Sequence, residues 1–195
     1  MAAFSLAGCA SGPIDMVQAE TDAPRVLEEQ AVLRDGAQAL AAHVDEAGWS
    51  VAPPAADQAR SFLGRLIGGE SAPADQTDPV ADYLEGMTLA RIAAHIDALA
   101  AKTLAVSDQA NAVAAAPQGL SRDALQRDIA AAESALGAIR RARAFFAEVG
   151  ARVSAPGDSV AVGLDDLKAA ETALAEAADA LAERRWSGHG VRLSG

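Results

Sequence analysis

Two histidines with neighbouring carboxylates are the residues of this sequence that come nearest to a metal site. His43 is followed by Asp45 and Glu46, and His95 is followed by Asp97. His43 and Glu46 would lie one turn apart on a helix, but two ligands do not complete a metal site. A di-iron carboxylate bundle needs Glu-x-x-His on each of two helices, and that spacing does not occur in the sequence. The sequence therefore predicts no bound metal, and it places both histidines beside a buried helix stripe.

Cys9 is the only cysteine, and the residues that would make it or a serine a catalytic nucleophile are missing. No Gly-x-Ser-x-Gly elbow occurs, and the glycines are scattered rather than grouped in a phosphate-binding loop. One cysteine also excludes covalent haem attachment through Cys-x-x-Cys-His. These patterns favour a non-enzymatic protein without a cofactor, with a small-ligand-binding bundle that uses His43 or His95 as an alternative.

The segment around Cys9 carries a second kind of chemistry. Leu6-Ala7-Gly8-Cys9 follows the short apolar stretch at residues 2–5. It resembles the lipobox of bacterial lipoproteins, in which small residues end in a cysteine that receives lipid. The resemblance covers only about residues 4–10. It implies cleavage between Gly8 and Cys9, a diacylglyceryl thioether on the Cys9 sulfur, and a further acyl chain such as palmitate on the new amino terminus.

The same resemblance implies a location. Residues 1–8 would be the remnant of a signal peptide, and Ala10, where an aspartate would favour the inner membrane, implies the periplasmic side of the outer membrane. A secretory signal has a basic segment and about 7–15 apolar residues, whereas eight residues without Lys or Arg precede Cys9. This interpretation therefore expects the reading frame to extend upstream of Met1. If Met1 is the true start, we expect a soluble cytoplasmic, self-associating coiled-coil protein instead.

Composition restricts the partners. The formal charge of −11 argues against nucleic acid, which requires a basic surface. Hydrophobic residues make up 51% of the chain but aromatic residues only 4%, which suits closely packed, alanine-rich helices. No run of about 18 apolar residues occurs in the sequence, so we expect the lipid on Cys9 to provide any membrane attachment.

Proline, glycine and capping residues divide the chain into helices. Asp78-Pro79 and Ser121 are strong start signals, and Thr21 or Asp22 can cap the first helix with Pro24 near its first turn. The expected helices cover residues 21–47, 56–68, 78–116, 121–153 and 159 or 164 to 185. Short turns between the long helices predict an antiparallel up-and-down bundle of about four long helices plus one short helix, an all-α fold.

Apolar residues at spacings of three and four predict which faces are buried. In the helix over 78–116 the pattern changes phase near Met87. The expected buried positions are Val26, Leu33, Ala37, Leu40, Val44 and Ala47; Leu89, Ile92, Ile96, Leu99, Thr103, Val106, Ala110 and Val113; Leu125, Ile129, Ala132, Leu136, Ile139, Arg143 and Phe146; and Leu164, Leu167, Leu174, Ala178 and Leu181.

Arg140, Arg141 and Arg143, with Arg152 nearby, form the main basic cluster. Arg143 falls on a buried stripe, so we expect its stem to pack and its guanidinium to reach an acidic neighbour such as Glu171 or Glu85. The alternative is that the three arginines form a docking patch for a partner, either an acidic envelope protein or a sugar polymer.

Together these patterns predict a signal remnant at 1–8, a flexible tether at 9–20, a bundle at 21–186 and a loose tail at 187–195. The function expected from them is a non-enzymatic scaffold or binding module, anchored to the membrane through lipid on Cys9.

Overall fold

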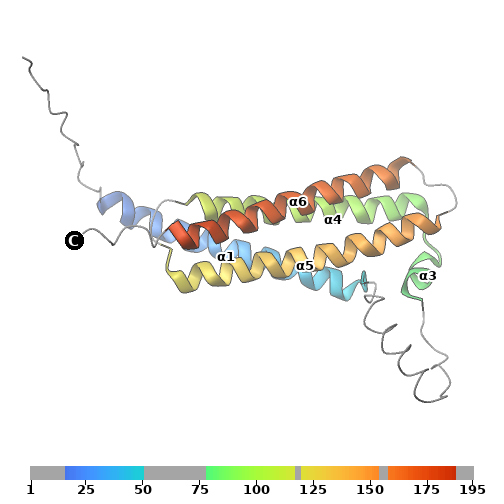
Figure 1. The fold of residues 1–195 in the computed structure, drawn as a ribbon, viewed down its shortest axis with the longest axis horizontal. Coiled ribbons are helices and arrows are strands. Elements are labelled where there is room, and N and C mark those ends of the chain that lie inside the picture. Colours follow the sequence, from blue (N-terminus) through green and yellow to red (C-terminus); the bar gives the residue numbers. More distant parts are fainter. Residues whose placement is uncertain (1–15, 51–77, 117–119, 154–157, 188–195) are drawn as a thin grey trace, which may run out of the picture.

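The computed structural model describes residues 16–50, 78–116, 120–153 and 158–187. All regular secondary structure within these residues is α-helix. The four long helices are α1 (Met16–Glu46), α4 (Leu89–Ala115), α5 (Arg122–Arg152) and α6 (Asp158–Ser187), and α3 (Pro79–Leu84) is short. The long helices lie along one another as an elongated bundle, with α3 at one end (Figure 1). This confirms the predicted all-α bundle. No helix among the described residues is long and apolar enough to cross a membrane.

The order of the helices around the bundle differs from the order along the chain. Extensive interfaces join α4 to α6, α1 to α5, α5 to α6 and α1 to α4, whereas α4 and α5 touch only slightly. Contacts between Gln30 and Asp128 and between Asp45 and Arg141 show that α1 and α5 run parallel. Successive long helices alternate in direction, as predicted. However, α4 and α5 lie diagonally across the bundle. Its two largest interfaces, α4 with α6 and α1 with α5, each join parallel helices that are not consecutive.

Two predicted helix starts are confirmed by their hydrogen bonds. The Asp78 carboxylate accepts from the backbone N–H groups of Val80 at 3.1 Å and Ala81 at 3.3 Å, and Pro79 fills the first helical position. The Ser121 hydroxyl accepts from the N–H of Ala124 at 3.2 Å. Each side chain thereby satisfies donors that a helix leaves free at its first turn.

The prediction of one continuous helix over residues 78–116 is wrong. Helix α3 ends at Leu84, and α4 begins only at Leu89. Gly86 between them has a φ of +75°, a left-handed conformation that glycine adopts without a steric cost. Thr88 then caps α4 by accepting from the N–H of Arg91 at 3.3 Å. The phase change near Met87 therefore marks a break between two helices and not a step within one.

The predicted start of the first helix also needs correction. Helix α1 begins at Met16, so Pro24 lies in its interior and Thr21 and Asp22 do not cap it. The φ of proline is close to that of a helix, so the ring is tolerated here with the loss of one backbone hydrogen bond. Residues 16–20, predicted as part of the tether, are helical. The Cys9 segment, the expected helix at 56–68 and the tail from 188 onwards lie outside the described residues.

The predicted stripes form most of the core. Of the expected positions, Leu89 and Ala47 are exposed and Arg143 and Leu164 are partly exposed, while the others are buried. The most extensive interface is between α4 and α6, where Gly163 lies against Ile96 and Asp97. A Cβ atom on Gly163 would lie 3.1 Å from Ile96 Cγ2 and 3.0 Å from Asp97 Oδ1. The missing side chain thus allows the two helices to approach closely.

A buried polar layer interrupts the apolar interface between α1 and α5. Asp128 is fully buried and Gln30 is 1% exposed. The Gln30 amide nitrogen donates to one Asp128 carboxylate oxygen, and Arg34 Nε donates to the other at 2.7 Å. Gln30 lies seven residues before buried Ala37, and Asp128 lies seven residues before buried Ala135. The two polar residues therefore occupy facing positions in the repeat, where a polar pair can specify helix register.

Arg184 joins the end of α4 to α6. Its guanidinium donates to the backbone carbonyls of Val113, Ala114 and Ala116. These acceptors lie at the carboxyl end of α4, where helix carbonyls lack partners within the helix and the helix dipole is negative. A side chain of α6 thus caps α4.

Candidate functional sites

Aromatic and imidazole rings gather at the end of the bundle near α3. Trp49, which follows α1, is 6% exposed. Its ring centroid lies 5.2 Å from that of His43, 5.5 Å from that of His95 and 4.9 Å from that of Phe146. The structure therefore brings the two candidate histidines to one tryptophan, although they lie on different helices. We call His43, Trp49, Tyr83, His95, Phe145 and Phe146 the aromatic cluster.

Tyr83 ties α3 to this cluster. Its hydroxyl lies 2.9 Å from His95 Nδ1, within hydrogen-bonding distance. Its ring packs edge-on against Phe145 and Phe146, with centroids 5.2 Å and 5.8 Å away. The break at Gly86 makes these contacts available, because it separates α3 from α4 and places α3 against α5.

The environment of the cluster disfavours charge. Partial burial, reinforced by the nearby positive charge of Lys102, lowers the pKa of His43, and Glu46 opposes this effect. Burial raises the pKa of Tyr83 to about 12, so its phenol stays protonated near neutral pH. Neutral rings can pack against one another without a desolvation cost for ions. The cluster is thus suited to closing the bundle end.

Metal binding receives no support from this arrangement. Among the described residues, no group of three or more His, Cys, Asp or Glu side chains is placed to hold one ion. His95 Nδ1 already faces the Tyr83 hydroxyl, and His43 and His95 approach each other through the Trp49 ring. The structure accounts for both imidazoles as packing residues at the edge of the core, the environment expected from their positions.

The three arginines of the predicted contact patch all have carboxylate partners in the chain. Arg140 Nε lies 3.3 Å from Glu171, and Arg143 Nε contacts the other oxygen of the same carboxylate. Arg141 lies 2.8 Å from Asp45. Arg143 thus pairs with Glu171, one of the two acidic residues proposed for it. Contact of these arginines with a separate partner stays a prediction.

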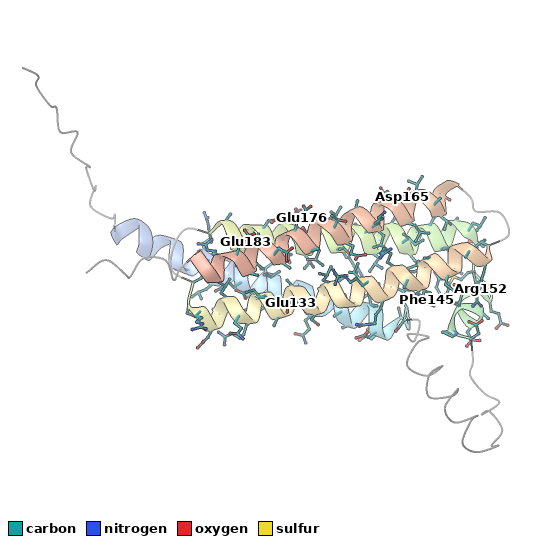
Figure 2. All side chains as sticks on the ribbon, in the orientation of Figure 1. Glu133, Phe145, Arg152, Asp165, Glu176 and Glu183 are labelled. Atoms are coloured by element: carbon teal, nitrogen blue, oxygen red, sulfur yellow. The ribbon has the colours of Figure 1, made fainter. Side chains whose placement is uncertain are left out.

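Arg152 forms a further link at the α3 end. It contacts Asp78, the residue that caps α3, and lies 3.0 Å from Glu148 one turn earlier in α5. The hydrogen bond from Arg152 lowers the pKa of Asp78 and raises that of Arg152. Figure 2 shows Arg152 and Phe145 toward this end of α5. Solvent screens these exposed charges, so we expect the ion pairs to add little to the stability of the protein.

A hollow of about 410 Å³ lies between α5 and α6, toward the end away from α3. We call it the acidic groove. It is lined by Glu133, Leu136, Gly137 and Arg140 from α5 and by Ala175, Ala178, Asp179 and Ala182 from α6. Figure 2 shows Glu133 on α5 and Glu176 and Glu183 on α6 along this half of the molecule. The groove was not among the sites predicted from the sequence, and its one sequence signal is Gly137 in the interior of a long helix.

A second, smaller hollow of about 310 Å³ lies between α1 and α4, and Val32, Gln109 and Ala112 are among its lining residues. Gln109 Oε1 is buried there without a hydrogen-bond partner among the described residues. It lies only 2.5 Å from the place where a Cβ atom on Gly36 would be. The amide of Gln109 therefore fills the space that Gly36 leaves open, and the packing of the chain itself accounts for this glycine.

Comparisons with protein-family models, with curated proteins and with solved structures find no match to this chain. The candidate lipidation residue Cys9 and the preceding Gly8 lie outside the described residues.

Proposed function

We propose that this protein is a lipid-anchored, non-enzymatic binding module of the bacterial cell envelope, held on the periplasmic face of the outer membrane. The observation that carries the proposal is the lipobox-like segment Leu6-Ala7-Gly8-Cys9. Acyl chains on Cys9 would attach the protein, because each buried methylene contributes about 0.8 kcal/mol and two or more chains make the attachment stable.

The bundle supports a binding role rather than catalysis. Glu171, Asp78 and His95 are engaged in ion pairs, a helix cap and ring packing. A catalytic site instead needs a nucleophile or general base held beside a place for substrate. A rigid bundle with an open groove on one side is suited to presenting a surface to a partner.

The anchor is tested by replacing Cys9 in the complete reading frame, including any codons in frame upstream of Met1. Expressed in a bacterium with an outer membrane, the unaltered protein should incorporate radioactive palmitate and sediment with outer membranes. Cys9→Ser should lose both properties. A matched control, Cys9→Ser combined with Ser11→Cys, keeps one thiol nearby but removes it from the lipobox, and it should also stay unlabelled.

Sorting provides a second measurement. By analogy with known lipoproteins, Ala10→Asp should move the labelled protein toward the inner membrane without reducing palmitate incorporation. Palmitate labelling and membrane sedimentation that persist in Cys9→Ser would refute the proposal. A protein that is unlabelled and soluble from the start would favour the cytoplasmic coiled-coil alternative.

A further inference from the structure

We infer that the acidic groove between α5 and α6 is the docking site for a basic amphipathic helix of a partner protein. The inference rests on the binding-module part of the proposed function but does not depend on lipid at Cys9. The groove is an open hollow lined mainly by small side chains, together with the exposed carboxylates of Glu133 and Asp179. Three observations support this occupant: the space above Gly137, the charge of the edges and the length of the stripe along α6.

The packing of the chain itself does not explain why residue 137 is a glycine. A glycine inside a helix destabilises it by about 1 kcal/mol relative to alanine. Gly163 and Gly36 have close neighbours in the space that a Cβ atom would occupy, and a Cβ atom on Gly150 would lie 3.3 Å from Leu164 Cδ1. A Cβ atom on Gly137 would meet only the end of the Arg141 side chain, at 3.8 Å. The space above Gly137 is therefore open to an external group.

The charge of the groove favours a basic occupant. Glu133 and Asp179 line it and take part in no ion pair within the described part of the chain. The one lining cation, Arg140, shares the Glu171 carboxylate with Arg143, so the lining residues carry two carboxylates against one guanidinium. A second copy of this chain would bring another formal charge of −11 to the surface, which opposes self-association. Lys or Arg side chains of a partner would instead complement the two carboxylates.

The shape of the groove favours a helix. Thr172, Ala175, Asp179 and Ala182 form one stripe along α6, and ten residues of helix extend about 15 Å. Ala175, Ala178 and Gly137 project little from the helix surface, so a third helix could lie between α5 and α6 with its axis close to both. We therefore expect about three turns of a partner helix to fill the groove, with an apolar side chain above Gly137 and cations beside Glu133 and Asp179.

Photocrosslinking in cells tests the site directly. The photoreactive residue p-benzoylphenylalanine is placed at exposed Thr172, at the end of the stripe, and as a control at Leu104, which is 45% exposed on α4. After irradiation, the crosslinked segment is identified by peptide mass spectrometry. We expect an adduct from position 172 with a Lys- or Arg-rich segment of helical periodicity in another protein, and no such adduct from position 104.

Variants of the groove then test whether its charge and shape determine binding. The crosslinked segment is synthesised as a peptide, and its Kd for the full chain is measured. Glu133→Gln with Asp179→Asn should weaken binding roughly tenfold, and Gly137→Leu should weaken it at least as much by filling the hollow. Asp165→Asn with Asp166→Asn removes the same charge from α6 outside the groove and should leave the Kd within about twofold.

Four outcomes would overturn the inference: no adduct at position 172, an adduct with a second copy of this chain, an adduct with an acidic segment, or a Kd that the groove variants do not change. The Kd measurement can be repeated with the Cys9→Ser protein in a soluble extract. Loss of membrane anchoring and loss of groove binding are therefore separate results.

Discussion

The Gln30 amide donates to the Asp128 carboxylate between two parallel helices that residues 47–121 separate in the sequence, and both side chains are withdrawn from solvent. Arg34 completes the arrangement by binding the second carboxylate oxygen. A buried carboxylate is tolerated only when hydrogen bonds and opposite charge replace its hydration. The pair therefore determines how α1 is aligned with α5 as well as contributing to their contact.

Replacing one member of this layer should be costly. Asp128→Ala leaves the Gln30 amide without its acceptor and Arg34 without its counter-ion, and we expect the free energy of unfolding to fall by about 2–4 kcal/mol. Urea denaturation followed by circular dichroism measures this loss. The control is the double change Gln30→Leu with Asp128→Leu, which removes both polar groups and should cost clearly less. Equal losses in the two variants would contradict a specific polar pairing.

His43 should make stability depend on pH. Its pKa in the folded protein lies below the usual value of 6.5 because of partial burial and the charge of Lys102. In acid the unfolded chain therefore binds a proton more readily than the folded chain. The contribution of neutral His43 to the free energy of unfolding is fully present above pH 6.5. It decreases as the pH falls through that value and levels off below the pKa of His43 in the folded protein.

The contribution is measured as the change in melting temperature between about pH 7.5 and pH 5. The decrease should be smaller in His43→Asn than in the unaltered protein, and Lys102→Met should reduce it partly. Comparing variants removes the effect of the carboxylates, which all these proteins share. An equal decrease in His43→Asn and the unaltered protein would show that His43 is not the titrating group.

Two helix-interior glycines should respond oppositely to the same substitution. Gly163→Leu would force a side chain into Ile96 at the closely packed α4–α6 interface, and it should destabilise the protein by about 1–3 kcal/mol or more. Gly137→Leu places the side chain in the open groove and gains helix propensity, so stability should stay equal or rise by up to about 1 kcal/mol. Urea midpoints of the two variants provide the comparison. A large loss of stability in Gly137→Leu would show that the space is not open.

Local chemistry was sufficient to predict the caps at Asp78 and Ser121 and most of the buried stripes, and it narrowed the partner of Arg143 to two residues, one of which is Glu171. Asp78 and Ser121 act through residues two or three positions away, and the buried stripes depend only on helical periodicity. The break at Gly86 was missed because a single glycine is also tolerated inside a helix. The groove was missed because the space above Gly137 depends on what a distant helix places there.

Longer-range features could not be predicted in the same way. A short turn determines that the next helix reverses direction, but it does not determine which neighbour that helix packs against. The placement of α4 diagonal to α5 and the meeting of His43, Trp49 and His95 both depend on this choice. These contacts join side chains from separate helices, and no spacing along one helix encodes them.

The order of helices around the bundle also restricts how the chain can fold. The main interface of α4 is with α6, and that of α1 is with α5, so the contacts that bury most of the core span long stretches of sequence. Such contacts form more slowly than those of a hairpin because long loops must close first. The slight α4–α5 contact provides little to hold those two helices together as a hairpin. During synthesis, the core therefore cannot be completed before α6 has left the ribosome.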